Sequence, residues 1–344
     1  MMGEKMTGRE RLLNALAGKE TDRPAAISAC QYATYELMEA AGASWPEAHH
    51  DAALMAKLSG AGATIIGLDA IRAPYCQTVE AEAMGAVIKS GGKTHIPSIA
   101  RHPYTFEDTP VVPSDFLDRG RIPAVLEAVT RMKEQLGAQV VVMGGIGGPF
   151  SIANSLVGIT PFLKAMFKKP DSITPFLEAG YEAALAFGRA FIRAGADVIV
   201  IEDMMASLDM ISPKNFRSMA APYEKKLIEQ LSVPVILHIC GKLDKVMPDI
   251  AATGVSAISV ETAVDIPAAK AIFREAGIHT PIVGDINPSG VLLQGSPEEV
   301  KAAVRDALAR GVDIISPGCA VAPSTPLCNL KAMVEAAKAG TVSA

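Results

Sequence analysis

Short runs of apolar residues recur along the whole chain, each closed by glycine, proline or a polar residue. Eight of these runs have the length of a strand, and most are apolar at consecutive positions rather than at alternate ones. Continuous apolar runs are typical of parallel strands that are buried on both faces. The strands are expected at residues 23–29, 63–69, 139–145, 197–203, 233–240, 254–261, 281–286 and 312–319.

Most of these runs are followed by a segment with helix signals. Thr7 and Glu10 form a capping-box pattern, which predicts a helix before the first strand. Ser296 and Glu299 repeat the pattern, and Gly311 closes the helix that they begin. Eight alternating strand–helix units predict a (β/α)8 TIM barrel, with a doubly wound open sheet as the alternative.

Residues 85–99 break this alternation. Two strand-like arms flank Gly91 and Gly92, which is a hairpin signal. We therefore expect a β-hairpin inserted after the second strand. No linker, repeat or low-complexity segment divides the chain, so the sequence predicts one TIM-barrel domain over residues 1–344 with an N-terminal helical extension.

Composition and charge exclude several classes of protein. Apolar residues make up 49% and charged residues 20% of the 344 positions, which predicts a sizeable core. The net charge of −5 argues against nucleic-acid binding. No apolar run is long enough for a bilayer, and the first residues lack the apolar core of a signal peptide. Five cysteines in so long a chain favour free or metal-bound thiols in a reducing compartment, so we expect a cytoplasmic protein.

Four potential metal ligands lie near the ends of predicted strands. His238 and Cys240 are two residues apart, so in a strand both would face the same side. That pair alone fits a buried core equally well, but Cys319 ends the last strand and adds a second thiol near the same rim. Two thiolates and an imidazole favour Zn²⁺. Glu261, at the end of the sixth strand, is either a fourth, exchangeable ligand, a group that orients a ligand, or a solvated carboxylate.

Three protein ligands leave one corner of a tetrahedron open, which is typical of catalytic zinc. A zinc ion with thiolate ligands is poorly suited to making hydroxide, but it deprotonates a bound thiol. The expected chemistry is therefore alkylation at sulfur, in which an activated thiol attacks a methyl donor.

The sequence resembles the methylcobamide:coenzyme M methyltransferases of the uroporphyrinogen decarboxylase superfamily. The similar segments are TGRERLLNALAGKETDRP at 7–24, GGIGGPFSIANSLVG at 144–158, HIC at 238–240 and PGC at 317–319. The resemblance implies zinc held by His238, Cys240 and Cys319, with coenzyme M bound through its sulfur. It also implies that the methyl group comes from a methylated corrinoid (methylcobalamin-like) on a separate small protein, giving methyl-coenzyme M and Co(I) corrinoid. The spacing that includes Glu261 is also similar to that of cobalamin-independent methionine synthase, where a glutamate joins the zinc shell.

Other readings stay open. The methyl acceptor could be tetrahydrofolate or another thiol, and the barrel could be a non-catalytic corrinoid-binding module. A plain uroporphyrinogen decarboxylase is disfavoured, because that enzyme carries an arginine after its first strand whereas residues 28–36 here contain none.

Further polar and small residues are weaker candidates for the site. Asp203 and Asp285 end strands and could orient a zinc ligand, although a helix cap or loop anchor is the simpler role. Gly147 and Gly148 follow the third strand and would let a flat corrinoid, or a phosphate, approach the backbone. Arg72, expected just after the second strand, is a candidate partner for the sulfonate of coenzyme M. The remaining thiols have no partner pattern: Cys30 and Cys76 are expected at core or loop positions, and Cys328 at a structural one.

Overall fold

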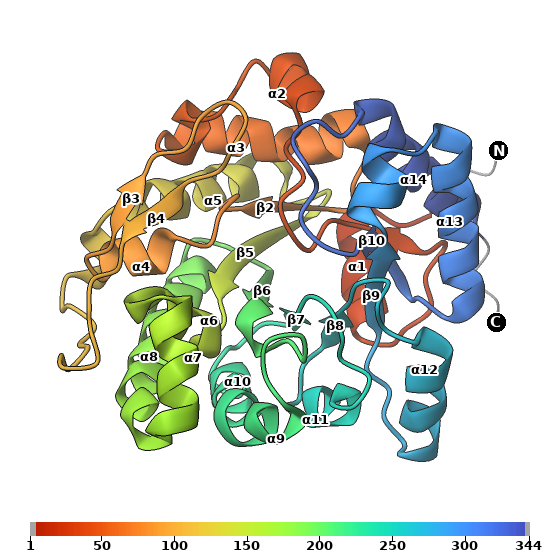
Figure 1. The fold of residues 1–344 in the computed structure, drawn as a ribbon. Helices are drawn as coiled ribbons and strands as arrows, with labels where there is room; N and C mark the ends of the chain where they lie inside the picture. The colour runs from red at the N-terminus through yellow and green to blue at the C-terminus, as the bar shows by residue number, and fades with distance from the viewer. Residues whose placement is uncertain (1–4, 341–344) are drawn as a thin grey trace.

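The computed structural model describes residues 5–340. Eight parallel strands form one sheet that curves into a nearly closed barrel, with helices around it (Figure 1). The predicted TIM barrel is therefore confirmed. The strands are β1 (Ala25–Ala26), β2 (Ala70–Ala73), β5 (Val141–Gly147), β6 (Val198–Glu202), β7 (Val235–His238), β8 (Ala257–Ser259), β9 (Ile282–Ile286) and β10 (Ile314–Pro317).

The strands run around the barrel in the order β1-β10-β9-β8-β7-β6-β5-β2. The first strand therefore pairs with the last, which brings segments from the two ends of the chain side by side. The gap in the ladder lies between β1 and β2. One backbone hydrogen bond crosses it, from Asp69 N to Ala26 O at 2.8 Å.

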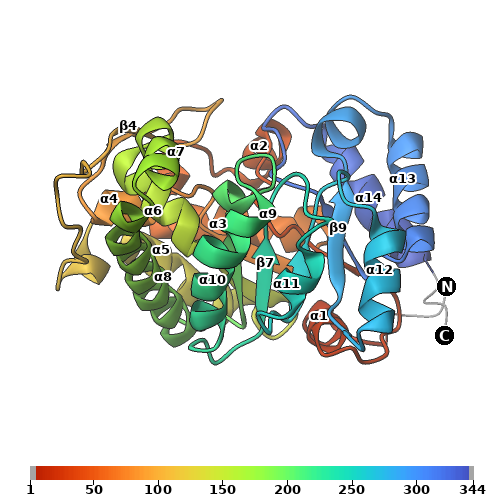
Figure 2. The same ribbon diagram turned by 60° about the horizontal axis from the view of Figure 1, so that its bottom comes forward.

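Two apolar layers hold the barrel together. The larger one packs the outer faces of the strands against the helices. The smaller one fills the barrel interior with side chains such as Val141, Val200 and Ile314. Leu12 and Leu16 of α1 (Gly8–Leu16) join this inner layer, so α1 closes one end of the barrel, opposite α2 (Figure 2). The other end is left to the loops that follow the strands.

The helices surround the sheet, and both predicted capping boxes are present, at Thr7 and Ser296. Besides α1, the helices are α2 (Tyr35–Ala41), α3 (Ala52–Ala61), α4 (Val79–Ala83), α5 (Ile122–Leu136), α6 (Pro149–Val157), α7 (Ile159–Lys168), α8 (Thr174–Arg193), α9 (Pro213–Asn215), α10 (Ala221–Ile228), α11 (Met247–Ala251), α12 (Ile266–Glu275), α13 (Pro297–Arg310) and α14 (Leu327–Ala339). Between residues 5 and 340, no single helix is long and apolar enough to cross a membrane; only α6 and α7 taken together reach that length, and they are bent by 107°.

The inserted hairpin is confirmed. Strands β3 (Val87–Lys89) and β4 (Ser98–Arg101) pair antiparallel and project from one side of the barrel, with a bridge between Gly92 and His95 near the tip (Figure 1).

The second strand is the one element that the apolar pattern misplaced. The strand was expected at residues 63–69, but Gly62–Ile66 form a π-helical turn that continues α3. The chain then reverses at Gly67, whose φ of 91° lies in the left-handed region that favours glycine. The strand begins only at Ala70, so the apolar run at 63–66 reflects helix packing rather than a buried strand.

Candidate metal centre

The predicted ligands lie at the carboxyl ends of their strands. His238 is the last residue of β7, and Cys240 follows it by two positions. Glu261 follows β8 and Cys319 follows β10 by the same offset. Because these ends share one rim of the barrel, segments far apart in the sequence deliver their side chains to one place.

The sulfur and nitrogen atoms converge. Cys240 Sγ lies 3.1 Å from His238 Nε2 and 3.2 Å from Cys319 Sγ. Zinc–sulfur bonds of about 2.3 Å would place two thiolates of a tetrahedral site about 3.8 Å apart, so a small outward shift accommodates the ion. Two thiols and an imidazole are the ligands that a soft divalent metal prefers, so this donor set fits such an ion.

His238 is held in one orientation. Its ring is fully buried, and Nδ1 lies 3.0 Å from Ser259 Oγ on the neighbouring strand. An Nδ1–H donated to this hydroxyl leaves the lone pair of Nε2 directed at Cys240, which is the arrangement that metal-binding histidines use. Ser259 has no sequence motif, but its register partner across the β7–β8 pair is His238.

Glu261 reaches the same cluster. One of its oxygens, Cys240 Sγ and Cys319 Sγ all lie within 4.8 Å of one another. Oε2 accepts a hydrogen bond of 3.1 Å from the Gly241 backbone N–H. Burial, and then the nearby Cys319 sulfur, raise the pKa of the Glu261 carboxyl. The position fits the expected exchangeable ligand, and that role stays a prediction.

The two half-buried thiols differ in pKa. The hydrogen bond between the Cys240 and Cys319 sulfurs raises the pKa of Cys240, with burial adding to it. The same hydrogen bond lowers the pKa of Cys319, helped by one from Cys30. The pKa values of the two thiols therefore shift in opposite directions in the absence of a cation. A bound dication would favour the thiolate form of both residues.

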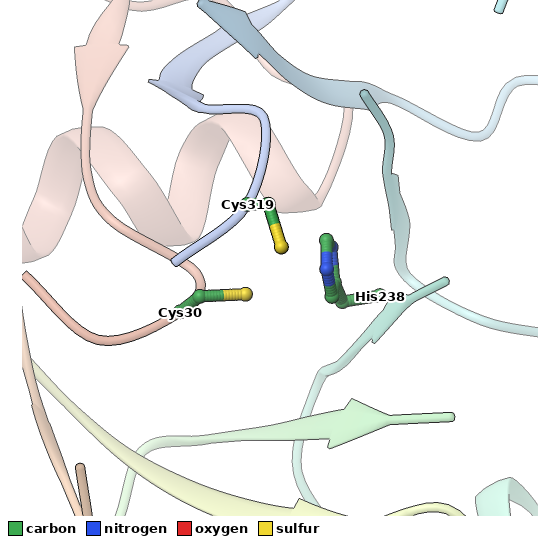
Figure 3. A group of neighbouring side chains, drawn as sticks. All are labelled: Cys30, His238 and Cys319. Carbon is green, nitrogen blue, oxygen red and sulfur yellow. The ribbon is translucent and has the colours of Figure 1, made fainter. Parts of the chain in front are cut away.

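A third thiol, which the sequence interpretation placed in the core or a loop, belongs to this cluster. Cys30 Sγ, a ring nitrogen of His238 and Cys319 Sγ lie within 4.8 Å of one another. Figure 3 shows the sulfurs of Cys30 and Cys319 directed toward the imidazole. Cys30 is buried in the loop after β1, as expected, but the sequence interpretation did not place it beside the other ligands. Its only signal in the sequence is its place just beyond the first strand, at the same rim of the barrel.

Asp203 and the two glycines form a separate polar group. The Asp203 carboxylate accepts hydrogen bonds from the backbone N–H of Ser151, at 2.7 Å, and of Phe150, at 3.3 Å, so it caps α6. Burial raises the pKa of Asp203 to about 6. A Cβ at Gly148 would lie 2.2 Å from the Asp203 carboxyl carbon, and Gly147 donates its N–H to a buried glutamate, Glu80, at 2.7 Å. Gly148 therefore makes room for the buried Asp203 carboxylate, whereas Gly147 makes room for the Ile152 side chain.

Two further candidates lie elsewhere than the sequence suggested. Asp285 was expected to reach the barrel mouth, but its carboxylate pairs with Arg310 of α13, at 2.8 and 3.0 Å. Arg72 lies within β2 rather than after it, and its buried guanidinium pairs with Glu202. Recognition of a sulfonate by Arg72 would require Glu202 to give up this contact.

Comparisons with known proteins agree with this architecture. Residues 7–340 match the family model described as uroporphyrinogen decarboxylase (URO-D). The chain is 41% identical over 334 residues to the methylcobamide:CoM methyltransferase MtaA of Methanosarcina barkeri, which covers 96% of this chain and 98% of that protein. It is 40% identical over 336 residues to the MtbA protein of the same description from Methanosarcina mazei, with the same coverage.

Solved structures are similar as well. A methyltransferase from Methanosarcina mazei superposes with a TM-score of 0.93 at 39% identity, covering 97% of this chain and 99% of that one. A B12-independent methionine synthase from Shewanella, at 14% identity and a TM-score of 0.59, shares the fold. The chain therefore belongs to the uroporphyrinogen decarboxylase family, in the branch that contains the methylcobamide:coenzyme M methyltransferases.

Proposed function

We propose that this protein is a zinc-dependent methyltransferase that moves a methyl group from a methylated corrinoid protein to the thiol of coenzyme M. The products are methyl-coenzyme M and the Co(I) corrinoid. The observation that carries the proposal is the convergence of Cys240 Sγ with His238 Nε2 at 3.1 Å and with Cys319 Sγ at 3.2 Å. The similarity to two methylcobamide:CoM methyltransferases supports the choice of donor and acceptor.

His238, Cys240 and Cys319 would hold the zinc. Zinc at this place supplies the positive charge that keeps a thiol deprotonated at neutral pH. The chain itself does the positioning: Ser259 orients the imidazole, and the buried ring excludes water from one side of the site. Cys240 and Cys319 are only half-buried, so the opposite side stays open to acceptor and donor.

Glu261 lies where it can occupy the exchangeable corner or accept the proton of an incoming thiol. Its carboxyl is within 4.8 Å of both half-buried sulfurs. The raised pKa of this carboxyl, caused by burial and then by Cys319, suits a group that takes up a proton.

The test is methyl transfer from free methylcobalamin to coenzyme M, followed by the colour change of the corrinoid. We expect transfer by the wild-type protein containing one zinc ion per chain, and loss of transfer and of stoichiometric zinc in Cys319→Ala. Cys328→Ala is the matched control, because Cys328 is an exposed free cysteine outside the cluster. Unchanged transfer in Cys319→Ala would refute the proposal.

The same assay separates the alternatives. Transfer to tetrahydrofolate or to another thiol but not to coenzyme M keeps the reaction class and changes the acceptor. Tight corrinoid binding without transfer to any acceptor favours a binding module. A decarboxylase of Synechococcus is 31% identical over 231 residues, so release of carbon dioxide from uroporphyrinogen is the check for that activity.

A further inference from the structure

A cavity of about 690 Å³ lies at the closed end of the barrel. It is bounded by the loop between α1 and β1, by α12 and α13, and by Pro281 and Asp313, which directly precede β9 and β10. These are the amino ends of the strands, whereas the metal ligands follow the carboxyl ends, and the cavity shares no residue with the ligand cluster. Its volume is in the range of small-molecule sites, about 300–1,000 Å³.

The walls of this cavity are largely apolar. They include the buried Pro24, Phe273 and Pro281, together with the half-buried Ile278 and Leu308. Apolar walls favour the hydrocarbon or ring part of a ligand, because its burial removes apolar surface from water.

The rim of the cavity carries unbalanced positive charge. Lys19, Lys270 and Arg274 line it together with a single carboxylate, Asp313. Oδ2 of Asp313 already accepts hydrogen bonds from Lys270 Nζ, at 2.5 Å, and from Ile282 N, at 2.7 Å. Within residues 5–340, the exposed side chains of Lys19 and Arg274 have no ion-pair or hydrogen-bond partner. Two cationic groups therefore remain uncompensated here, in a chain whose net charge is −5.

The lining also offers neutral hydrogen-bonding groups. Thr21 and Thr280 contribute hydroxyls and His279 an imidazole, and none of these side chains is hydrogen-bonded to another residue of the described part of the chain. The carboxylates next in sequence to the two free cations, Glu20 and Glu275, do not line the cavity. An anionic ligand would therefore meet donors and positive charge at the rim.

We propose that this cavity binds a phosphorylated small molecule with an apolar or aromatic body, of the class of a nucleoside monophosphate. Arg274 and Lys19 bind the phosphate at the rim, and the body lies against the apolar walls. A phosphate monoester carries close to two negative charges at neutral pH, which matches the two uncompensated cations better than a carboxylate does. The planar guanidinium of Arg274 also suits bidentate binding of a phosphate. This site is independent of the proposed function.

The test is isothermal titration calorimetry of the full chain with adenosine monophosphate (AMP) at low ionic strength, where charge–charge attraction is least screened. We expect one AMP per chain and an affinity lower by about 10-fold or more in Arg274→Ala. Arg193→Ala is the matched control, because Arg193 also lies in the last turn of its helix, is exposed and lines no part of the cavity. Adenosine, which lacks the phosphate, and inorganic phosphate, which lacks the body, should each bind at least about 10-fold more weakly than AMP.

Absence of AMP binding, or equal affinity in wild type and Arg274→Ala, would overturn the proposal. Adenosine that binds as tightly as AMP would exclude recognition of the phosphate, and inorganic phosphate that does so would exclude a role for the apolar walls. Should Arg274→Ala fail to fold, Lys19→Ala and the three ligands with wild-type protein decide the question. Methyl transfer should be unchanged in Arg274→Ala, so failure of this proposal is separable from failure of the proposed function.

Discussion

The two ends of the barrel each carry a cluster of buried polar side chains, and the clusters differ in charge pairing. At the end closed by α1, Asp69 pairs with Arg11 at 2.6 Å and with Arg23 at 2.9 Å. At the mouth, the donors are three thiols, an imidazole and a carboxylate. The Arg72 guanidinium acts on Cys30 but is already paired with Glu202. The first cluster pairs its own charges, whereas the second gathers electron-pair donors beside a guanidinium that Glu202 has taken up.

This difference in charge pairing distinguishes the functional end of the barrel from the structural one, even when no ion is bound. Buried charges are tolerated when they are paired and hydrogen-bonded, and such pairs belong to the framework. A set of electron-pair donors gathered without a counter-charge is stable only as protonated groups or around a cation. The contrast predicts that substitutions at the closed end lower the unfolding free energy, and that substitutions at the mouth lower the affinity for the metal.

The largest effect on stability is expected at the closed end. Asp69→Asn removes the buried carboxylate that Arg11 and Arg23 share, while Arg11 keeps its pair with Asp22 at 2.7 Å. Removal of one partner from a buried ion pair costs about 3–5 kcal/mol of unfolding free energy. Urea denaturation measures this loss. Zinc affinity per folded molecule should not change.

The control for that variant is Glu127→Gln. Glu127 pairs with Arg131 on α5, but both side chains are about half exposed, so the loss should be below about 1 kcal/mol. Equal losses in the two variants would show that the Asp69 cluster contributes no more than a surface pair. A large loss of zinc affinity in Asp69→Asn would abolish the distinction between the two ends.

At the mouth, Ser259→Ala is expected to weaken metal binding rather than folding. The hydroxyl lies 3.0 Å from Nδ1 and fixes the direction in which His238 presents Nε2. Loss of a partner that orients a metal-binding histidine typically costs roughly 10–100-fold in metal affinity. Competition with a chromophoric chelator measures the zinc affinity. Ser256→Ala is the matched control, because Ser256 instead accepts a hydrogen bond from Val235 N. An unchanged affinity in Ser259→Ala would mean that other contacts orient the imidazole.

The fold was largely predictable because it depends on local pattern. Consecutive apolar residues marked seven of the strands, and the capping residues at Thr7 and Ser296 marked two helix starts. The second strand was misplaced because an apolar run packs equally well in a helix. The one signal against a strand there was Gly67, whose turn separates the helix from the strand. Because of that error, Arg72 was expected beyond the strand, whereas it lies within β2.

The site was predictable where its residues sit close together or at strand ends. The offset between His238 and Cys240 and the place of Cys319 were enough to bring them together in the prediction. Cys30 and Ser259 were missed because their neighbours come from ring closure and from cross-strand register, which no local pattern encodes. Asp285 takes a structural role like the anchor that was expected as the simpler one, and its alternative role beside a zinc ligand was harder to exclude from the sequence. The direction of a strand side chain depends on exact position, and its carboxylate pairs with Arg310 of α13.

The smallest predicted effect concerns pH and again distinguishes the two ends. Hydrogen bonding from Arg11 lowers the pKa of Asp22, at the closed end, to about 2, below its ordinary value of 3.8. A carboxyl whose pKa is depressed in the folded state adds stability above the unfolded pKa, and this stability is lost as the pH falls through the folded value. The contribution at neutral pH is about 2 kcal/mol. It should disappear between about pH 4 and pH 2.

Asp22→Asn removes this contribution. The difference in unfolding free energy between wild type and variant should therefore be constant at neutral pH and shrink as the pH falls below about 4. Urea titrations at a series of pH values, on protein freed of metal, measure it. Removal of the metal is needed because acid also protonates zinc ligands. A difference that keeps its size down to about pH 2 would mean that Asp22 stabilises the fold through packing and not through its charge. The ion pairs at the closed end would then contribute less to the stability of the protein than proposed here.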